Sequence, residues 1–587
     1  MPPLGTPLNS TQWAFVRSLR HHVDAWNLEE DVTSEAMGRA AAKVENVEAV
    51  LEKLEEEAQS VAEKLQRYKH RRKKVLHTDW GHRGDPGEVV GQMALKPGHL
   101  AKAVEPARLH FWGVPSFEAE EFMDEENRAV FLDPLSHAAA PDLNQRPPPR
   151  VKVRIARRDK LALLEKLDSV ERLALVPSSS IRQGYENGLF TVPKDEVRDR
   201  MVLDARPPNC LEDNTDVWIR SLGSLVQFQH FFLEPNEDAR LFAEDLREFY
   251  HAFSISPSRV LRNALKLKVK PRLVEHLKCF HPGLQHEEFL VPCLRTMAMG
   301  DNRAVSFGQV AHLGVLLRTG ALRLADFICL AARPPRQRWL AGLMIDDLVL
   351  VEAVPRDVLG YSSTCEAIIK KVREQYEQVK LPRHEGKAVY NQALGTFWGA
   401  QFDGDAGLLR PNLKRAIPLA FIILRVLELG KVSGGLMEVI AGSLVAVFQL
   451  RRRFMSILQE IYGSQRGRRE EDVVLISADL RDELLCVLAL LPLSCIDMRL
   501  VPSPYLVCSD ASNSAEAAVR TRIGSAATRE LQKYGLQKGM WNKLLSPLES
   551  YMRKKGGESL RRNTRCILRG RPLRRQKLLS VLAGESK

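Results

Sequence analysis

The chain has 587 residues, 44% of them hydrophobic and 27% charged, with a formal net charge of +13. This length allows two to four domains with a sizeable core, and the composition is ordinary for a globular protein. The apolar run 416–429 is interrupted by Arg425 and is shorter than the roughly 20 residues of a membrane helix, so we expect no membrane span.

The absence of a secretory signal and the pattern of cysteines indicate the cellular compartment of the protein. The N-terminus has no basic segment followed by an apolar one, which argues against a secretory signal. The nine cysteines form no CxxC pair and no disulfide framework. We therefore expect an intracellular protein of the nucleus or cytoplasm, where thiols stay reduced.

Residues 1–140 are predicted to form a helical N-terminal region. Within it, apolar residues recur every three or four positions over 44–68, which is a heptad pattern. The pattern fits a coiled-coil arm that allows self-association. It fits equally well a single amphipathic helix docked on its own domain.

Composition changes divide the rest of the chain. The stretch APDLNQRPPPR makes 141–152 a proline-rich linker. The segments that follow are a mixed helix and strand region at 153–411, a helical region at 412–470, a region with returning strand signals at 471–550 and a basic tail at 551–587.

The positive charge is concentrated in that tail. Residues 553–577 hold eleven Lys or Arg and one Glu, a net of +10, which leaves +3 for the rest of the chain. Such a tail could bind phosphates or direct nuclear import, or it could be a solvated, disordered end.

Two segments of the mixed region carry charges at the ends of strands. In PKDEVRDRMVLDARPPN, Lys194, Arg198 and Arg200 precede a short strand, where they could bind a triphosphate or belong to an ordinary charged turn. In FAEDLREFYHAF, Asp245 ends a short apolar stretch and precedes three aromatic residues. On its own, such an aspartate is more often a helix cap.

The next segments supply a glycine turn and a pair of carboxylates. In TMAMGDNRAVSFGQVAH, Gly300 would let a backbone or a base pair come close. In AGLMIDDLVLVE, Asp346 and Asp347 lie at the connection of two apolar strands, where their charges repel. The stretch 393–411, ALGTFWGAQFDGDAGLLRP, is predicted to form a hairpin.

Taken in order, these segments resemble the motifs of reverse transcriptases from retrotransposons of the tyrosine-recombinase or long-terminal-repeat type. The resemblance covers residues 180–410 well and 411–515 loosely. The matching stretches are MVLDARPPN for the fingers motif, DLREFYHAF, MAMGDNRAVSFGQ and MIDDLVLVE for three palm motifs, LGTFWGAQFDG for the primer-grip hairpin, and YLVCSDAS for the first strand of ribonuclease H.

The resemblance implies an α+β right-hand polymerase with fingers, thumb and a ferredoxin-like antiparallel palm sheet. It implies RNA-directed DNA synthesis on an RNA or DNA template with a primer and deoxynucleoside triphosphates. Asp245, Asp346 and Asp347 would be the catalytic residues. Asp245 and Asp346 would hold two Mg²⁺ ions, for which Mn²⁺ can substitute.

Further roles follow from the same resemblance. Lys387 would be either the lysine that protonates pyrophosphate or a surface lysine. The remaining implied contacts are Lys194 and Arg200 with the triphosphate, Tyr250 as the steric gate against a ribose 2′-hydroxyl, Gly300 and Gln309 with template and nucleotide, and Trp398 and Gly399 in the primer grip.

The sequence also departs from the family. The second palm motif reads MAMG followed by Ala304 and Val305, where L-P-Q-G and S-P are common. Of the four carboxylates of a ribonuclease H site, only Asp510 and, less well, Glu516 have candidates, so we expect this part to be truncated and inactive. These departures support an alternative function, a degenerate retroelement product that binds nucleic acid without polymerising it.

A zinc site is a further alternative. Cys279, His281, His286 and Cys293 lie within fifteen residues, but their spacing does not match common structural zinc sites.

Overall fold

The residues that the computed structural model describes are 101–138, 149–182, 184–212, 221–330, 332–356, 361–511 and 516–533. They form two compact units. One unit spans 410–495, and the other combines 101–409 with 496–533. Both contain helices and strands, in agreement with the predicted α+β class.

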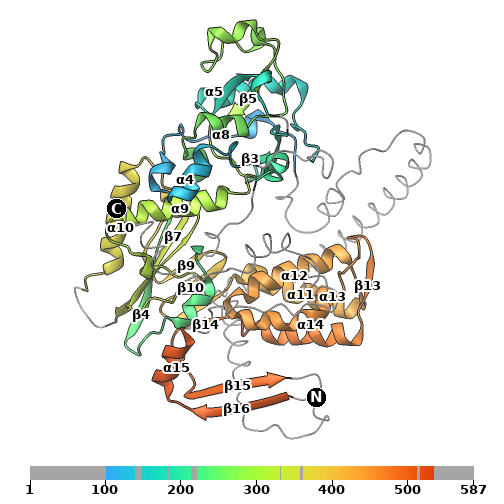
Figure 1. Cartoon of the computed structure of the whole chain (residues 1–587). Coiled ribbons are helices and arrows are strands. Elements are labelled where there is room, and N and C mark those ends of the chain that lie inside the picture. Colours follow the sequence, from blue (N-terminus) through green and yellow to red (C-terminus); the bar gives the residue numbers. More distant parts are fainter. Residues whose placement is uncertain are drawn as a thin grey trace, which may run out of the picture. The chain divides into compact units, whose positions relative to one another are not determined.

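The larger unit is organised around a four-stranded antiparallel sheet with the order β6-β7-β4-β8. Helix α9 (Ala304–Arg318) lies between β4 and β6 in the chain, and α10 (Thr364–Gln378) lies between β7 and β8. Figure 1 shows both helices beside the sheet. This βαββαβ connectivity is that of a ferredoxin-like sheet. The strands are β4 (Glu237–Asp245), β6 (Trp339–Met344), β7 (Asp347–Pro355) and β8 (Val389–Gln392).

Side chains from the sheet and both helices form the main hydrophobic core. Phe242 of β4, Leu350 of β7, Phe307 of α9 and Ile369 of α10 are fully buried in it. Six consecutive residues of β7 are buried, so the strand is covered on both faces, and this explains its uninterrupted apolar run. Helix α9 is buried on nearly all sides and therefore lies inside the unit.

The structure differs from the sequence prediction for residues 101–138, which were expected to belong to a separate N-terminal region. Phe117 and Phe131 are fully buried in the core of the central sheet. The Phe117 ring contacts Phe249 and Phe253, with ring centroids 6.5 and 5.1 Å apart. Because aromatic side chains bury so much apolar area, these residues belong to the larger unit.

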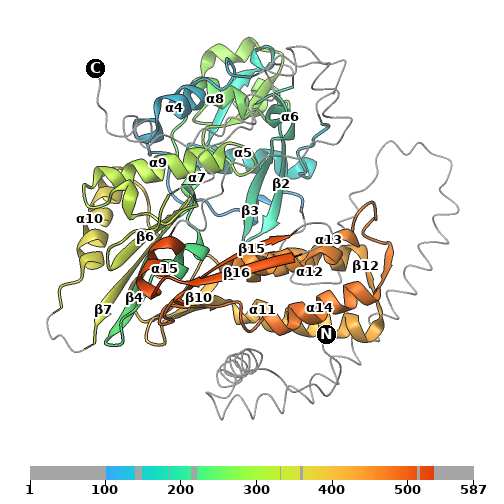
Figure 2. The ribbon, with the colours of Figure 1, turned by 60° about the horizontal axis from the view of Figure 1, so that its bottom comes forward.

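Smaller elements surround the central sheet. Figure 2 shows the hairpin of β2 and β3 and the helices near it. Two of the smaller sheets are strand pairs, β1 (Leu173–Pro177) with β5 (Leu290–Leu294) and β2 (Gly188–Pro193) with β3 (Asp199–Asp204). A four-stranded sheet has the order β14-β11-β10-β9 and consists of β9 (Leu394–Phe397), β10 (Ala400–Asp403), β11 (Leu408–Pro411) and β14 (Ile496–Asp497). The remaining helices before α9 are α4 (Glu125–Leu132), α5 (Lys160–Ser169), α6 (Arg206–Asn209), α7 (Phe249–Ala252) and α8 (Pro257–Arg262).

The smaller unit, 410–495, is a helical bundle with its own core. Its strand β13 (Val473–Leu475) pairs with β12 (Lys431–Ser433), and α14 packs against α11 and α13. The predicted boundary between 412–470 and 471–550 therefore falls inside one unit, because this pairing ties both sides together. The helices are α11 (Leu413–Leu429), α12 (Gly434–Phe448), α13 (Gln459–Gly463) and α14 (Ala478–Leu490).

One helix of this bundle is strongly apolar. Among the residues that the structure describes, only Gly434–Ile457 is long and apolar enough to cross a membrane. Half of its most apolar window is buried inside the protein, with Met437, Ile440 and Leu444 in the bundle core. The central helix of a bundle has such a composition because it is covered on several sides.

The C-terminal part of the described chain is a hairpin followed by a helix. Strand β15 (Tyr505–Ala511) pairs with β16 (Glu516–Arg522), and α15 (Ser525–Gln532) follows. Asp510 lies on β15 opposite Ala517. The predictions for 44–68, for most of the linker 141–152 and for the tail 551–587 fall outside the described residues.

The burial of Phe117 makes the contribution of 101–138 testable. We expect Phe117→Ala to lower the free energy of unfolding by about 3–5 kcal/mol, because it removes a buried ring and leaves a cavity. Val114→Ala, at a position that is 45% exposed, should change it by less than about 0.5 kcal/mol. Urea denaturation compares the two, and equal small effects would contradict a structural role for this segment.

Candidate active site

The three predicted catalytic aspartates lie at one end of two neighbouring strands. Asp245 is the last residue of β4 and is the register partner of Asp347, the first residue of β7. Asp346 immediately precedes Asp347, in the two-residue turn that joins β6 to β7. All three are partly buried, and the sheet brings together residues that are 101 positions apart in the chain.

The turn that carries Asp346 has a strained backbone. Ile345 has φ = 60°, a conformation that a β-branched residue rarely adopts. Gln309 of α9 supports it, because its Oε1 accepts from the Ile345 N–H at 2.9 Å and its Nε2 donates to the Leu343 carbonyl at 3.3 Å. Gln309 is only 1% exposed, and its Nε2 also donates to the Ser221 carbonyl at 3.2 Å. Its contact with template and nucleotide stays a prediction.

The carboxylates perturb one another. Burial, and then the charge of Asp245, raises the pKa of Asp346 above its usual range. Burial, followed by the charges of Asp346 and Asp245, raises the pKa of Asp347 to about 7. The sheet therefore holds like charges close together at a cost in free energy, an arrangement that is typical of functional sites.

Basic side chains surround this group. Lys387, at the end of a short 3-10 helix, places Nζ 2.6 Å from Oδ2 of Asp245. Arg200 at the start of β3 and Lys387 both act to lower the pKa of Asp346. Burial lowers the pKa of Lys194, whose neighbours include Glu248 and the cations Arg200 and Lys387. Of the predicted triphosphate cations, Arg200 therefore lies near the carboxylates, and Lys194 lies near Arg200 and Lys387.

Tyr250, the predicted steric gate, is close to the same turn. Burial, and then the charges of Asp346 and Asp301, raises the pKa of its hydroxyl. A side-chain carbon added at Gly308 would lie 3.2 Å from the Tyr250 ring and 3.1 Å from Ile345. The absence of a side chain at Gly308 therefore leaves the space in which Tyr250 and Ile345 approach α9.

The predicted second palm motif forms a tight loop against β3. Gly300 has φ = 111°, and a side-chain carbon there would lie 1.8 Å from the Leu203 carbonyl oxygen, so only glycine fits. The Leu203 N–H donates to the Met299 carbonyl at 2.8 Å. Asn209 adds a bond from its side-chain amide to the Gly300 carbonyl at 2.8 Å.

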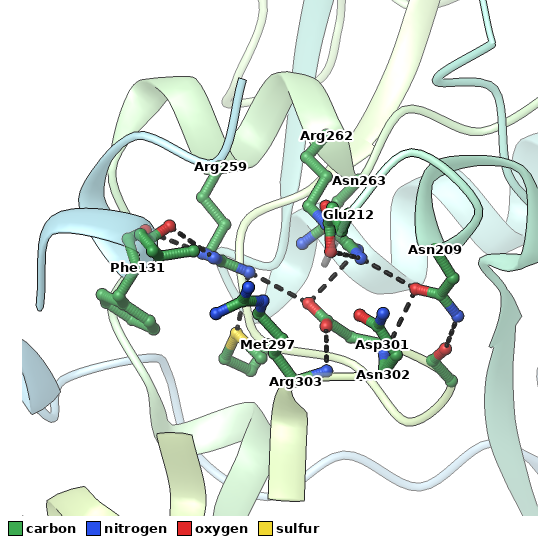
Figure 3. A network of polar contacts seen from close by, with 12 residues as sticks. Phe131, Asn209, Glu212, Arg259, Arg262, Asn263, Met297, Asp301, Asn302 and Arg303 are labelled. Carbon is green, nitrogen blue, oxygen red and sulfur yellow. Dashed lines mark hydrogen bonds and ion pairs between the residues drawn. The ribbon is translucent and has the colours of Figure 1, made fainter. Parts of the chain in front are cut away.

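A buried network of charges fixes the other end of this loop (Figure 3). Asp301 accepts from Arg259 at 2.9 Å and forms an ion pair with Arg262 at 3.1 Å. Arg262 also donates two hydrogen bonds to the Glu212 carboxylate, a bidentate contact at 2.5 and 2.9 Å. Arg259 donates to the carbonyls of Phe131 and Val130, at 2.7 and 2.9 Å, and so ties the end of α4 to the loop.

The predicted primer-grip residues occupy the turn between β9 and β10. Trp398 has φ = 47° and Gly399 has φ = 77°. The indole covers Gly223 and Gly342, where added side-chain carbons would lie 2.1 and 2.3 Å from its ring. The Trp398 Nε1 is buried and has no hydrogen-bond partner among the described residues. The indole therefore packs the hairpin against the backbone of Gly223 and Gly342, and Trp398 also lines the cavity described next.

One cavity connects the carboxylates with this hairpin. It has a volume of about 410 Å³, and it is lined by parts of β4, β7, β8 and the β9–β10 hairpin. Its lining includes Asp245, Asp347, Lys387, Thr396 and Gly399. Two sets of residues that the sequence placed in different motifs thus face the same space.

The donor set fits a hard divalent cation in its chemistry. The repulsion that raises the pKa values of crowded carboxylates is relieved when a cation neutralises their charge. Mg²⁺ commonly takes only one or two protein carboxylates and completes its shell with water and phosphate oxygens. Among the described residues no group of three or more His, Cys, Asp or Glu side chains could hold a metal ion by itself, and this applies to the predicted zinc ligands too.

Several important residues have no motif signal. Arg259, Arg262 and Glu212 are charged residues in segments that resemble no motif, and only their burial shows their role. His312 of α9 is fully buried beside the Ile345–Asp346 turn. The sequence offered one hint for it, since a histidine three positions after Gln309 lies on the same side of a helix.

Comparisons with known proteins give a distant likeness. No family model matches the sequence, and no curated protein matches it. The chain is similar to the foamy viral protease-reverse transcriptase in complex with double-stranded DNA and with an RNA/DNA hybrid, at a TM-score of 0.39 and 13% identity. These likenesses cover 66% and 74% of this chain.

A form of that protein designated dRH, in complex with double-stranded DNA, has the same TM-score and identity. The likeness covers 66% of this chain and 58% of that one, so the chain spans less than two thirds of its length. A TM-score below 0.5 does not carry a functional assignment.

The buried network predicts a large effect at Asp301. We expect Asp301→Asn to lower the free energy of unfolding by about 3–5 kcal/mol, because it leaves the buried Arg259 without a compensating charge and Arg262 with Glu212 alone. The matched control is Asp405→Asn, which breaks an ion pair with Arg240 at a carboxylate that is 61% exposed. This change should cost less than about 1 kcal/mol. Denaturant titration distinguishes them, and a small effect at Asp301 would contradict the network.

The crowded carboxylates predict a pH-dependent stability. The folded state holds the proton of Asp347 up to about pH 7, whereas an unfolded chain releases it near 3.8. Wild-type stability should therefore fall as the pH rises from about 4 to 7, and Asp347→Asn should remove this loss. The variant should gain about 2 kcal/mol above pH 7, half of the roughly 4 kcal/mol that the pKa difference represents, because water screens a partly buried group.

Thermal unfolding in metal-free buffer at pH 4, 6 and 8 tests this effect. The two proteins should differ least at pH 4, where the folded carboxyl is neutral and the unfolded one is only partly ionised. A variant that is less stable than the wild type at pH 8 would contradict the crowding.

Proposed function

We propose that the chain is an RNA-directed DNA polymerase that adds deoxynucleotides to a primer 3′-hydroxyl. The observation that carries the proposal is the register of β4 and β7, which sets Asp245 opposite Asp347 with Asp346 in the turn beside them. Crowded carboxylates with cations on the facing loops suit a reaction in which a polyphosphate must bind next to a metal site.

The chain's own residues have distinct roles in this reaction. The primer 3′-oxygen attacks the α-phosphorus, a new phosphodiester bond forms, and the bond to pyrophosphate breaks. Lys194 and Arg200 would hold the triphosphate so that this attack is in line. Asp245 and Asp346 would hold two Mg²⁺ ions, or Mn²⁺ in their place, which when bound polarise the phosphate and neutralise its developing charge.

The positions of the other predicted residues support this assignment. The Tyr250 ring lies against the turn of Asp346, where it would crowd a ribose 2′-hydroxyl and select deoxynucleotides. Gly399 and Thr396 line the cavity that begins at the carboxylates, so the hairpin is placed to hold a primer end. The central sheet would then be the palm, the β2–β3 hairpin part of the fingers, and the helical unit 410–495 the thumb.

The altered second palm motif does not remove these elements. Gly300 is still required by its approach to Leu203, and Asp301 anchors the loop through buried arginines. This argues for an active polymerase over the alternative, a degenerate retroelement product that only binds nucleic acid. No comparable support exists for ribonuclease H activity, which we do not assign to Asp510.

Primer extension tests the proposal. The wild-type chain should extend a DNA primer on an RNA template with Mg²⁺ or Mn²⁺, and Asp346→Asn should lower the rate at least about 100-fold, because a metal-bound carboxylate is lost. Asp405→Asn, which changes an exposed carboxylate outside the cavity, should extend at the wild-type rate.

Binding measurements separate the two functions. If the wild type binds primer-template but neither it nor Asp346→Asn extends the primer, the polymerase assignment is wrong and the binding protein is favoured. Extension by the wild type with full activity in Asp346→Asn would show that the site lies elsewhere.

A further inference from the structure

His312 of α9 lies directly beneath the turn that carries Asp346. Its ring is fully buried, with Nδ1 2.7 Å from the Ile345 carbonyl oxygen and Nε2 2.6 Å from the Tyr376 hydroxyl. Tyr376 comes from α10 and is also fully buried. One side chain therefore links the turn to the second helix behind the sheet.

The partners fix the direction of both hydrogen bonds. A carbonyl oxygen can only accept, so Nδ1 must carry the proton and donate it to Ile345. In a neutral imidazole the other nitrogen is then an acceptor, so the Tyr376 hydroxyl donates to Nε2. Burial keeps the ring neutral, since it lowers the pKa of His312 to about 4.

The contacts of His312 complement those of Gln309. Gln309 accepts from the N–H of Ile345, and His312 donates to the carbonyl of the same residue. Both polar groups of a strained residue are thus held by neighbouring turns of α9. The His312 ring also lies 5.6 Å from the ring of Phe249, which immediately precedes Tyr250.

We propose that His312 and Tyr376 form a positioning pair that holds the Ile345–Asp346 turn in its strained conformation and so presents the Asp346 carboxylate toward Asp245. The inference rests on the proposed function for its catalytic consequence, but the mechanical claim does not. Without the bond from Nδ1, Ile345 would lose an interaction that offsets its unfavourable φ. The turn would then relax and move the carboxylate.

Two substitutions separate the two nitrogens. His312→Asn retains an amide N–H close to the position of Nδ1, whereas His312→Gln extends its amide toward the position of Nε2 and loses the donor to Ile345. Tyr376→Phe keeps the ring and removes only the hydroxyl. His230→Gln changes a different buried histidine, whose Nε2 contacts Gln229 at 3.2 Å, and is the matched control.

The first measurement needs neither metal nor substrate. In hydrogen–deuterium exchange with metal-free protein, a peptide covering 340–350 should exchange faster in His312→Gln than in the wild type. His312→Asn should be close to the wild type, Tyr376→Phe intermediate, and His230→Gln unchanged. If His312→Gln and Tyr376→Phe both fold and neither alters exchange in this peptide, the positioning pair is refuted, whatever the activity.

The second measurement uses primer extension at varied deoxynucleotide concentration. We expect kcat to fall about 10- to 100-fold in His312→Gln, as for partners that orient a metal ligand, with KM for the nucleotide unchanged. His312→Asn should restore most of kcat, a rescue that a purely space-filling role would not produce. A rise in KM with unchanged kcat would overturn the role in presenting Asp346.

The two measurements also separate this inference from the proposed function. A wild type that never extends a primer removes the polymerase assignment, while faster exchange at 340–350 in His312→Gln would still establish the support of the turn. Active wild type with unaltered exchange and kcat in His312→Gln removes the inference and leaves the polymerase in place.

Discussion

Repulsion among Asp245, Asp346 and Asp347 is the constraint to which the rest of the larger unit responds. The strand register sets Asp245 directly opposite Asp347. Burial raises the free-energy cost of keeping the carboxylates charged. A site of this kind is stable only if its surroundings are rigid and if compensating cations are near. Both conditions are met, the first by the helices behind the sheet and the second by Lys387 and the β2–β3 hairpin.

Strain and support occur together around these carboxylates. Non-glycine residues with positive φ include Ile345, Trp398 and Glu248, all within segments that the sequence marked as motifs. Such conformations persist only where surrounding contacts over-determine them. Here α9 supplies hydrogen bonds to the first, and a packed indole fills the space behind the second. Precision at the site thus depends on residues that never touch a substrate.

Local patterns in the sequence were enough to predict the central hairpin, the β9–β10 hairpin and the grouping of Asp245 with Asp346, because these depend on short apolar strands and on a family resemblance. The role of Gln309 was harder, since the same residue type in the same motif can face a ligand or the backbone of a turn. Arg259, Arg262 and Glu212 could not be predicted from the sequence, and the one hint for His312 was its position three residues after Gln309. Their importance comes from burial and from partners far away in the chain, which a single sequence does not reveal.

Segment boundaries failed for a related reason. Residues 101–138 resemble no polymerase motif, yet Phe117 and Phe131 fill the core, and Arg259 grips the end of α4. This has a practical meaning for anyone who produces the protein. A recombinant fragment that begins at the proline-rich stretch would lack the buried rings of Phe117 and Phe131. Its buried Arg259 would also lack the carbonyl groups to which it donates. Such a fragment would expose a hydrophobic surface and aggregate. A lack of activity in that fragment would therefore say nothing about catalysis by the whole chain.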